Sequence, residues 1–214
     1  FQGLGGLMLS RQVGFWDFED RLRDLSAHGD PLERLSSTVD FEIFRPDLLA
    51  ALGERDRRKG GRPGFDPVLK FKMLVLQAMH GLSLDQTEFM LRDRLSWMRF
   101  CGLGPGDSVP DANTLWDYRE ALIAAGAFDA LFSRLDRAIT DAGYLAMSGH
   151  TARANAKKSA IRAHVEHPFA YQKSVMGLFI RTIGLARAQA RITLVNMTDN
   201  MNRWSWLNRR RASA

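Results

Sequence analysis

Apolar residues recur along this chain three and four positions apart, the spacing of one face of a helix, through nearly its whole length. No stretch alternates apolar and polar residues over the length of a strand, and no segment of the sequence repeats. The pattern therefore predicts an all-α fold, a helical bundle.

The helix expected after Asp66 has the most uniform apolar character. Asp66-Pro67 supplies an N-cap followed by a proline in the first turn, and Gly81 ends the helix after His80. A helix that is apolar on nearly every side is usually buried at the centre of a core, so we expect this role here. Its apolar positions are Leu69, Phe71, Met73, Leu74, Val75, Leu76, Ala78 and Met79.

Other helices are delimited by similar signals. A first helix is expected over 15–26, Asp30-Pro31 predicts the start of a second, and a short helix from Asp47 is closed by Gly53. Ser83 and Gln86 have the spacing of a capping box, in which each side chain bonds the backbone of the other residue. We expect a single helix after this box, with one apolar stripe: Leu84, Thr87, Leu91, Leu95 and Met98.

The second half continues the helical pattern up to a boundary. Asp111 is expected to cap one helix, Gly126 separates it from the next, and Gly143 ends that one. Residues 146–160 are small, polar and basic, which predicts a linker, and three helices are expected beyond it, over 160–173, 174–190 and 191–209. The buried faces of the two capped helices are predicted to be Leu115, Tyr118 and Leu122, and then Phe128, Leu131, Phe132, Leu135 and Ile139.

Charge is distributed unevenly over the 214 residues. Residues 151–214 carry 12 Lys and Arg against 2 Asp and Glu, a net of +10, whereas residues 1–150 carry a net of −4. A basic segment favours a polyanionic partner, because each neutralised phosphate releases condensed counterions. The single cysteine, Cys101, suits a reducing cytoplasm, and no apolar run approaches the roughly 20 residues of a bilayer span. Residues 1–3 look like the remnant of a cleaved tag.

Three groups of residues are candidates for contacts with nucleic acid. The helices on either side of Gly81, followed by the Asp111 helix, resemble a helix-turn-helix, in which a later helix enters the major groove. A plain helical hairpin in a bundle is the alternative. The exposed positions expected on the Asp111 helix are Asn113, Thr114, Asp117 and Arg119.

The second group is the glycine-rich connector 54–64, whose cations could enter a narrow minor groove; a solvated connector is the alternative. These cations are Arg57, Arg58, Lys59 and Arg62. The third group lies in and after the linker: Lys157, Lys158, Arg162 and Lys173.

Glu166 is the candidate catalytic residue. On a helix, Arg162 and Glu166 share a face and Lys173 follows two turns later, so a metal ion could sit at this carboxylate beside phosphates. An ordinary surface ion pair is the alternative. His164 and His167 flank Glu166, but their spacing is not that of a known zinc site.

These segments together are similar to a known family. Residues 61–67, 69–77, 81–83, 92–94 and 109–115 resemble, in order and spacing, the N-terminal helical domain of bacterial insertion-sequence transposases, in the InsH-like branch or insertion-sequence-five family. The likeness runs from about residue 10 to 149. Arg162, Glu166 and Lys173 fit the family's C-terminal Arg-Glu-Lys spacing, although Ser159 stands where the family has Tyr.

The resemblance implies a DDE enzyme with a ribonuclease-H-like core, which cuts and joins DNA with two Mg²⁺ ions held by two aspartates and a glutamate. Glu166 would be that glutamate, but the segment that should carry the aspartates is missing between Gly149 and Arg153. Two-metal chemistry needs several carboxylates around ions about 3.5–4 Å apart. The implied organisation is a DNA-binding domain over 10–145, a linker over 146–160 at an internal deletion, and catalytic-domain helices over 161–214.

We therefore expect a catalytically inactive DNA-binding protein without a metal cofactor, nucleoid-associated in the cytoplasm, which recognises transposon ends or related promoter DNA. Its expected partners are double-stranded DNA, a second copy in a homodimer and an intact transposase, with no membrane. One alternative is an Mg²⁺-dependent transposase component completed by a partner chain. Another is a structural homo-oligomer joined through exposed apolar faces: Val175, Phe179, Ile183, Met197, Met201 and Trp204.

Overall fold

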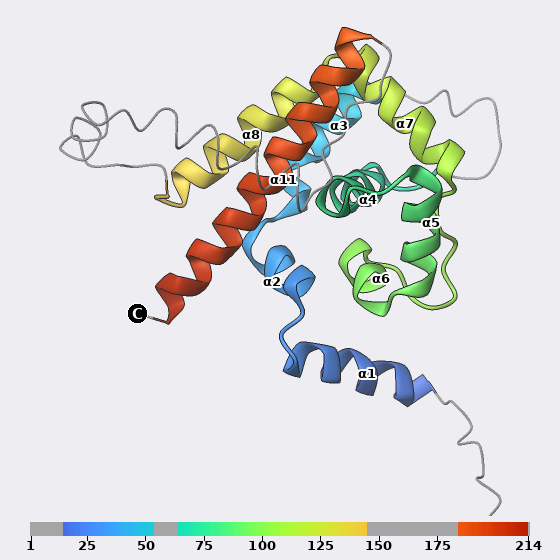
Figure 1. Ribbon diagram of the computed structural model, residues 1–214, viewed down its shortest axis with the longest axis vertical. Coiled ribbons are helices and arrows are strands. Elements are labelled where there is room, and N and C mark those ends of the chain that lie inside the picture. The colour runs from blue at the N-terminus through green and yellow to red at the C-terminus, as the bar shows by residue number, and fades with distance from the viewer. Residues whose placement is uncertain (1–14, 54–63, 145–183, 214) are drawn as a thin grey trace, which may run out of the picture.

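The computed structural model describes residues 15–53, 64–144 and 184–213, and within these ranges every regular element is a helix (Figure 1). The all-α prediction is therefore confirmed. The elements are α1 (Phe15–Ala27), α2 (Pro31–Thr38), the 3₁₀ turn η1 (Phe41–Phe44), α3 (Arg45–Leu52), α4 (Pro67–His80), α5 (Leu84–Asp93), α6 (Leu95–Cys101), α7 (Ala112–Ala124), α8 (Ala127–Asp141) and α11 (Leu185–Ala212).

Helix α4 lies at the centre of the bundle, seen nearly end-on in Figure 1, and packs against α3, α5, α6, α7 and α11. Its start is fixed by the Asp66 carboxylate, which accepts hydrogen bonds from the backbone N–H of Val68 at 2.7 Å and Leu69 at 3.2 Å. Its end is fixed by Gly81, whose φ of 63° is the left-handed region that glycine adopts without strain. Both predicted boundaries and the central position are confirmed.

Helix α11, with 28 residues, is the longest of the described helices and packs along α4, α8 and α2 (Figure 1). Its middle section is inserted into the core: Met197 and Met201 are fully buried and Trp204 nearly so. The expectation that these three residues form an exposed face is therefore wrong, because α11 packs against α4, α8 and α2. The expected boundary between 190 and 191 is also wrong, since one helix runs without a break from Leu185 to Ala212.

The stripe expected to continue from α5 to Met98 is interrupted. Arg94 has an extended backbone, φ −107° and ψ 119°, which separates α5 from α6. In an unbroken helix Phe100, nine residues after Leu91, would point half a turn away from it. The break lets α6 turn Trp97, Phe100 and the free thiol of Cys101 into the core, where all three are buried.

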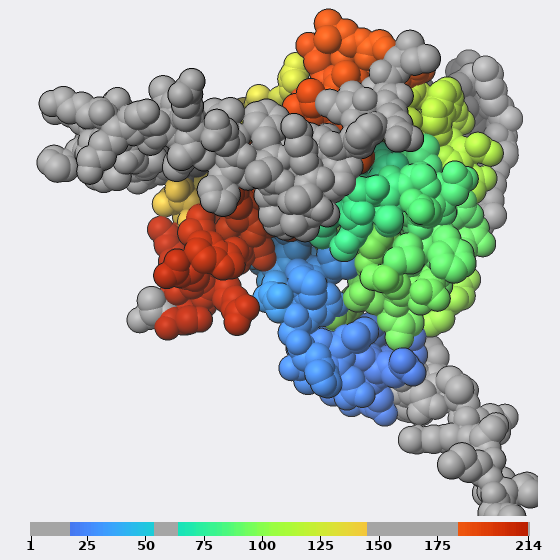
Figure 2. All heavy atoms as spheres, viewed as in Figure 1, coloured from blue at the N-terminus to red at the C-terminus, as the bar shows by residue number. Residues whose placement is uncertain are grey.

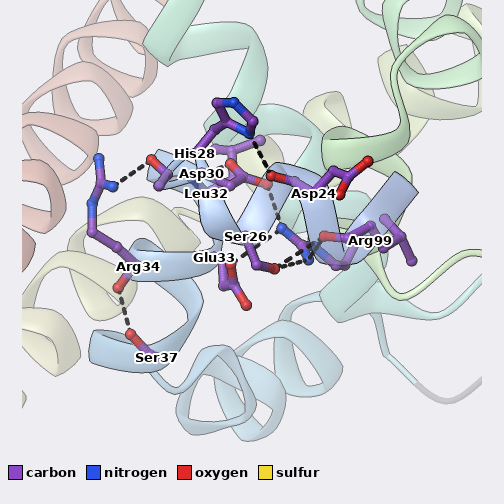
Figure 3. Close-up of polar contacts among 11 residues, drawn as sticks. Asp24, Ser26, His28, Asp30, Leu32, Glu33, Arg34, Ser37 and Arg99 are labelled. Atoms are coloured by element: carbon purple, nitrogen blue, oxygen red, sulfur yellow. Dashed lines mark hydrogen bonds and ion pairs between the residues drawn. The ribbon is translucent and has the colours of Figure 1, made fainter. Parts of the chain in front are cut away.

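Arg99 ties α6 to the first two helices (Figure 3). Its guanidinium donates to the buried carboxylate of Asp30 at 2.7 Å and to the Ser26 hydroxyl at 2.7 Å. Asp30 also accepts from the backbone N–H of Leu32 at 2.9 Å, so the same carboxylate caps α2, as predicted, and anchors α6. A second ion pair joins α3 to α8, where Arg134 Nη2 donates to Asp47 at 2.9 Å. None of the described helices has the length and apolar character to cross a membrane.

Candidate nucleic-acid interface

Helix α7 is held rigidly at both its start and its buried face. The Asp111 carboxylate accepts from the Thr114 backbone N–H at 2.7 Å, and Glu88 of α5 accepts from the Ala112 N–H at 2.8 Å. Hydrogen bonds from the Thr114 side chain and backbone hold the pKa of Asp111 below its usual value. The Tyr118 hydroxyl donates to the carbonyl of Pro67 at 2.8 Å, which fixes α7 against the start of α4. The expected caps and buried face are confirmed.

The outer face of α7 presents Asn113, Trp116 and Asp117 to solvent; Trp116 is 44% exposed. Asn113 and Asp117 are exposed as predicted, but Thr114 and Arg119 are only half-buried. Thr114 turns back to the Asp111 cap, and Arg119 follows the buried Tyr118 around the helix, toward α11. Of the three exposed side chains, Asn113 alone offers both a donor and an acceptor without a charge.

Of the two helices expected to form a helix-turn-helix, only α5 presents an accessible face. Helix α4 is buried nearly throughout, so it cannot enter a groove of DNA. Helix α5, which packs against α7, keeps an outer face that includes Phe89, 66% exposed, and the exposed Arg92. The accessible surface of this region is therefore that of α5 and α7.

Arg119 belongs to a cluster of arginines where α7 meets α11. Arg187 Nε donates to Glu120 Oε2 at 2.9 Å, and Arg119 Nη2 lies 3.5 Å from Glu120 Oε1. Arg191 is half-buried one turn further along α11, and no carboxylate in the described ranges lies within ion-pair distance of it. Burial lowers the pKa of the Arg191 guanidinium, and the nearby charge of Arg119 lowers it further.

These three arginines line one small cavity of about 30 Å³ between α4, α7, α8 and α11. Gln77 of α4 also lines it; this side chain is 4% exposed, and its Oε1 has no hydrogen-bond partner among the described residues. Glu120 Oε1 likewise accepts no hydrogen bond there. The cavity is therefore lined by three cations and by a glutamine whose Oε1 accepts no hydrogen bond, while Glu120 pairs with two of these cations.

A second basic region is the C-terminal end of α11, which Figure 2 shows in red, standing out at the lower left. Arg210 lies over the Trp206 ring at 4.8 Å, and Arg211 lies over Tyr144 at 4.3 Å and donates to the carbonyls of Ala142 and Gly143. Sequence reasoning missed this group, although three consecutive arginines signalled it. Its exposed arginines are Arg203, Arg209, Arg210 and Arg211.

Most of the predicted site residues lie outside the described residues. This is true of the connector cations Arg57, Arg58, Lys59 and Arg62, of the later cations Lys157, Lys158, Arg162 and Lys173, and of Glu166 with its flanking histidines. Within the ranges that the structure describes, no group of three or more His, Cys, Asp or Glu side chains is placed to hold a metal ion.

Comparison with known proteins gives one match. Residues 20–121 match the family described as Transposase domain (DUF772). No curated protein and no solved structure matches the chain. The matched segment runs from within α1 to within α7, so α8 and α11, which complete its core, lie beyond it. The chain from Asp20 to Ala121 is therefore similar to the transposase domains of this family.

Proposed function

We propose that this protein binds double-stranded DNA, at transposon ends or at promoter sequences related to them, and that it has no strand-cutting activity of its own. The kinship of residues 20–121 to a transposase domain supports the DNA partner. A transposase must recognise the DNA ends of its element, so a domain derived from a transposase is expected to bind such sites.

The observation that carries the proposal is the position of α11. This arginine-rich helix packs against α4, within the core of the transposase-related domain, rather than hanging from it as a separate tail. Its cations are therefore held at fixed positions relative to α7. Fixed cations set the register of a protein on the phosphate backbone, which a disordered basic tail does not do.

The proposal divides the contacts into two kinds. Arginines at the ends of α11 contact phosphates, and so do the predicted cations of the connector and the linker. Asn113 on the outer face of α7 is the candidate for reading a base edge, because an amide pairs with adenine through a donor and an acceptor together. Thr114 contributes to positioning Asn113 through the cap of α7.

The proposed lack of catalysis is supported by the sequence. The family that the chain resembles uses two aspartates and a glutamate, and the segment expected to carry the aspartates is missing before Glu166. One carboxylate cannot clamp two ions in the geometry that phosphoryl transfer requires. Glu166 is accordingly proposed as a remnant without a catalytic role.

The first experiment is binding of the purified chain to a pool of genomic DNA fragments at about 50 and 200 mM salt, with sequencing of the bound fraction. We expect a shared motif and salt-sensitive affinity. Absence of binding at the lower salt contradicts the proposal. A binding profile without any shared motif removes the site-specific part of it.

A pair of matched double variants tests the role of α11. Arg209→Ala with Arg210→Ala is expected to reduce the slope of log affinity against log salt by about 2, one for each lost phosphate contact. Arg21→Ala with Arg23→Ala removes the same charge from α1 and is expected to leave the slope unchanged. Equal effects of the two pairs would show that only net charge matters.

The inactive state is tested with magnesium and a duplex that contains the bound motif. No nicking is expected from the wild-type chain. Nicking that Glu166→Gln abolishes would instead establish a transposase activity.

A further inference from the structure

The cavity between α4, α7 and α11 contains more positive charge than the described residues neutralise. Arg119, Arg187 and Arg191 line it, whereas Glu120 is the only carboxylate that pairs with any of them in the described ranges. Glu120 is divided between two of these arginines, at 2.9 Å and 3.5 Å, which leaves Arg191 without a counter-charge there. Half-burying an unpaired guanidinium is costly unless another group compensates its charge.

The polar atoms of the cavity are also incompletely paired. The Gln77 side chain is 96% buried, yet Oε1 receives no hydrogen bond from any described residue. Buried amides are nearly always bonded on both their oxygen and their nitrogen, so such a group indicates a missing partner. Because Oε1 is an acceptor, its missing partner is a donor such as water, and it is the unbalanced charge of the arginines that points to an anion.

We propose that this cavity binds a phosphate group, held by the guanidinium groups of Arg119, Arg187 and Arg191. Guanidinium groups present their N–H donors in a planar fork that matches two phosphate oxygens at once. One carboxylate against three arginines leaves a net charge of +2, of which a phosphodiester offsets one unit and a phosphate ion up to two.

The volume is consistent with this ligand. A single water needs about 10–15 Å³, so a space of about 30 Å³ admits two oxygen atoms side by side. Two oxygens of a phosphate group can enter, while the remainder stays at the rim beside Arg187, whose side chain is 44% exposed. A larger anion, such as a nucleotide held by its base, does not fit inside.

The phosphate has two possible sources, a free ion or the backbone of DNA, and the second rests on the proposed function. In the DNA case the cavity gives α11 a second anchoring point far from its C-terminal arginines. Arg191 and Arg210 are 19 residues apart on one continuous helix, which at 1.5 Å per residue is about 28 Å. Two anchors at that separation would fix the orientation of a duplex along the helix.

The decisive variant is Arg191→Met, which keeps most of the apolar stem of the side chain but removes its charge. Its melting temperature without ligand is expected to equal or exceed that of the wild type, because an unpaired half-buried charge is removed. The control is Arg23→Met on α1, which removes one charge from an arginine that is 76% exposed. Arg191→Lys provides a second variant, which keeps the positive charge but lacks the planar pair of guanidinium N–H donors.

The first arm measures melting temperature against inorganic phosphate at constant ionic strength. Phosphate is expected to stabilise the wild type and Arg23→Met, in proportion to ligand saturation. Arg191→Met and Arg191→Lys are expected to bind phosphate about tenfold more weakly, the loss of one charged hydrogen bond. Equal stabilisation of all four proteins, or of none, overturns the free-ion form of the proposal and would mean that the cavity holds only water.

The second arm measures DNA affinity against salt. Arg191→Met is expected to reduce the salt slope by about 1 relative to Arg23→Met, as for one lost phosphate contact. If DNA binds with identical slopes to both, the proposed function stands and the DNA form of this site fails. If phosphate binds in an Arg191-dependent way but no DNA binds, the site stands and the proposed function fails.

Discussion

Two helices pass through the core of this protein and pack against each other, but their sequences specify them differently. Helix α4 is delimited by its own residues: Asp66 caps it, Pro67 follows, and Gly81 ends it. Helix α11 begins after Gly184 without a side-chain cap and is buried mainly in its middle section, with arginines toward both ends. The difference teaches that a central helix can be specified either by local signals or by the surfaces it covers.

The most demanding test of this comparison truncates one core side chain on each helix. Leu76→Ala on α4 and Met197→Ala on α11 are each expected to lower the free energy of unfolding by about 2–5 kcal/mol, because both side chains are completely buried. Urea denaturation measures both. Leu185→Ala, at a position 74% exposed on α11, is the control and should change stability by less than about 0.5 kcal/mol. A negligible effect of Met197→Ala would mean that α11 is not part of the core.

A smaller effect is expected from the cap of α4. Asp66→Ala removes the acceptor for two backbone N–H groups and an ion pair with Arg45 at 2.7 Å. The expected loss is about 1 kcal/mol, a typical value for an N-cap. Asp66→Asn should retain most of the capping and lose less. Identical losses for the two variants would show that the ion pair, rather than the cap, stabilises this end of α4.

The two helices also differ in how pH affects them. Burial raises the pKa of Asp66, but hydrogen bonds from Arg45 and the backbone outweigh it and leave the pKa lowered. Its contribution is therefore complete above the unfolded carboxyl pKa of about 3.9 and is lost as pH falls through the lower folded value. Burial raises the pKa of Asp199 on α11, which Arg203 only partly opposes. Asp199 thus reduces stability as pH rises from about 3.9 through its raised folded pKa.

Urea midpoints between about pH 3 and 7 separate these contributions. Asp66→Asn is expected to weaken the loss of stability in acid. Asp199→Asn is expected to raise the midpoint at pH 7 and to leave it nearly unchanged at pH 3, where the wild-type group is protonated. A midpoint at pH 7 that falls in Asp199→Asn would show that the charged form is stabilised by groups other than Arg203.

The smallest expected effect concerns the exposed end of α11. Arg211→Ala removes bonds to the carbonyls of Ala142 and Gly143, both at 3.3 Å, and the contact with the Tyr144 ring. The expected loss is about 0.5–1 kcal/mol, typical of an exposed cation over an aromatic ring. The matched control is Arg209→Ala, at an exposed position two residues earlier. Equal melting temperatures for the two variants would show that Arg211 does not hold α11 against the end of α8.

The features that the sequence predicted are those with a local cause. Asp30, Asp66, Ser83 and Asp111 cap helices where expected, because a cap depends on three or four neighbouring residues. The break at Arg94 has no glycine or proline to signal it; it arises because α6 must turn Phe100 inward.

The candidate site was predicted less completely for the same reason. Asn113 could be placed on an exposed face from the spacing of α7 alone. The surroundings of Arg119 could not be predicted in this way, because they depend on Arg187 and Arg191, more than 60 residues away in the sequence. The sequence of residues 185–212 contains no local signal that this helix packs against α4.

Cys101, buried at the end of α6, offers a native reporter of local opening. Burial raises the pKa of its thiol to about 12, so almost none of it is the reactive thiolate at neutral pH. A thiol reagent can therefore attack only after α6 leaves the core, and labelling at this single cysteine counts those openings. The labelling rate at rising urea would reveal whether α6 opens at a lower free energy than the whole molecule unfolds.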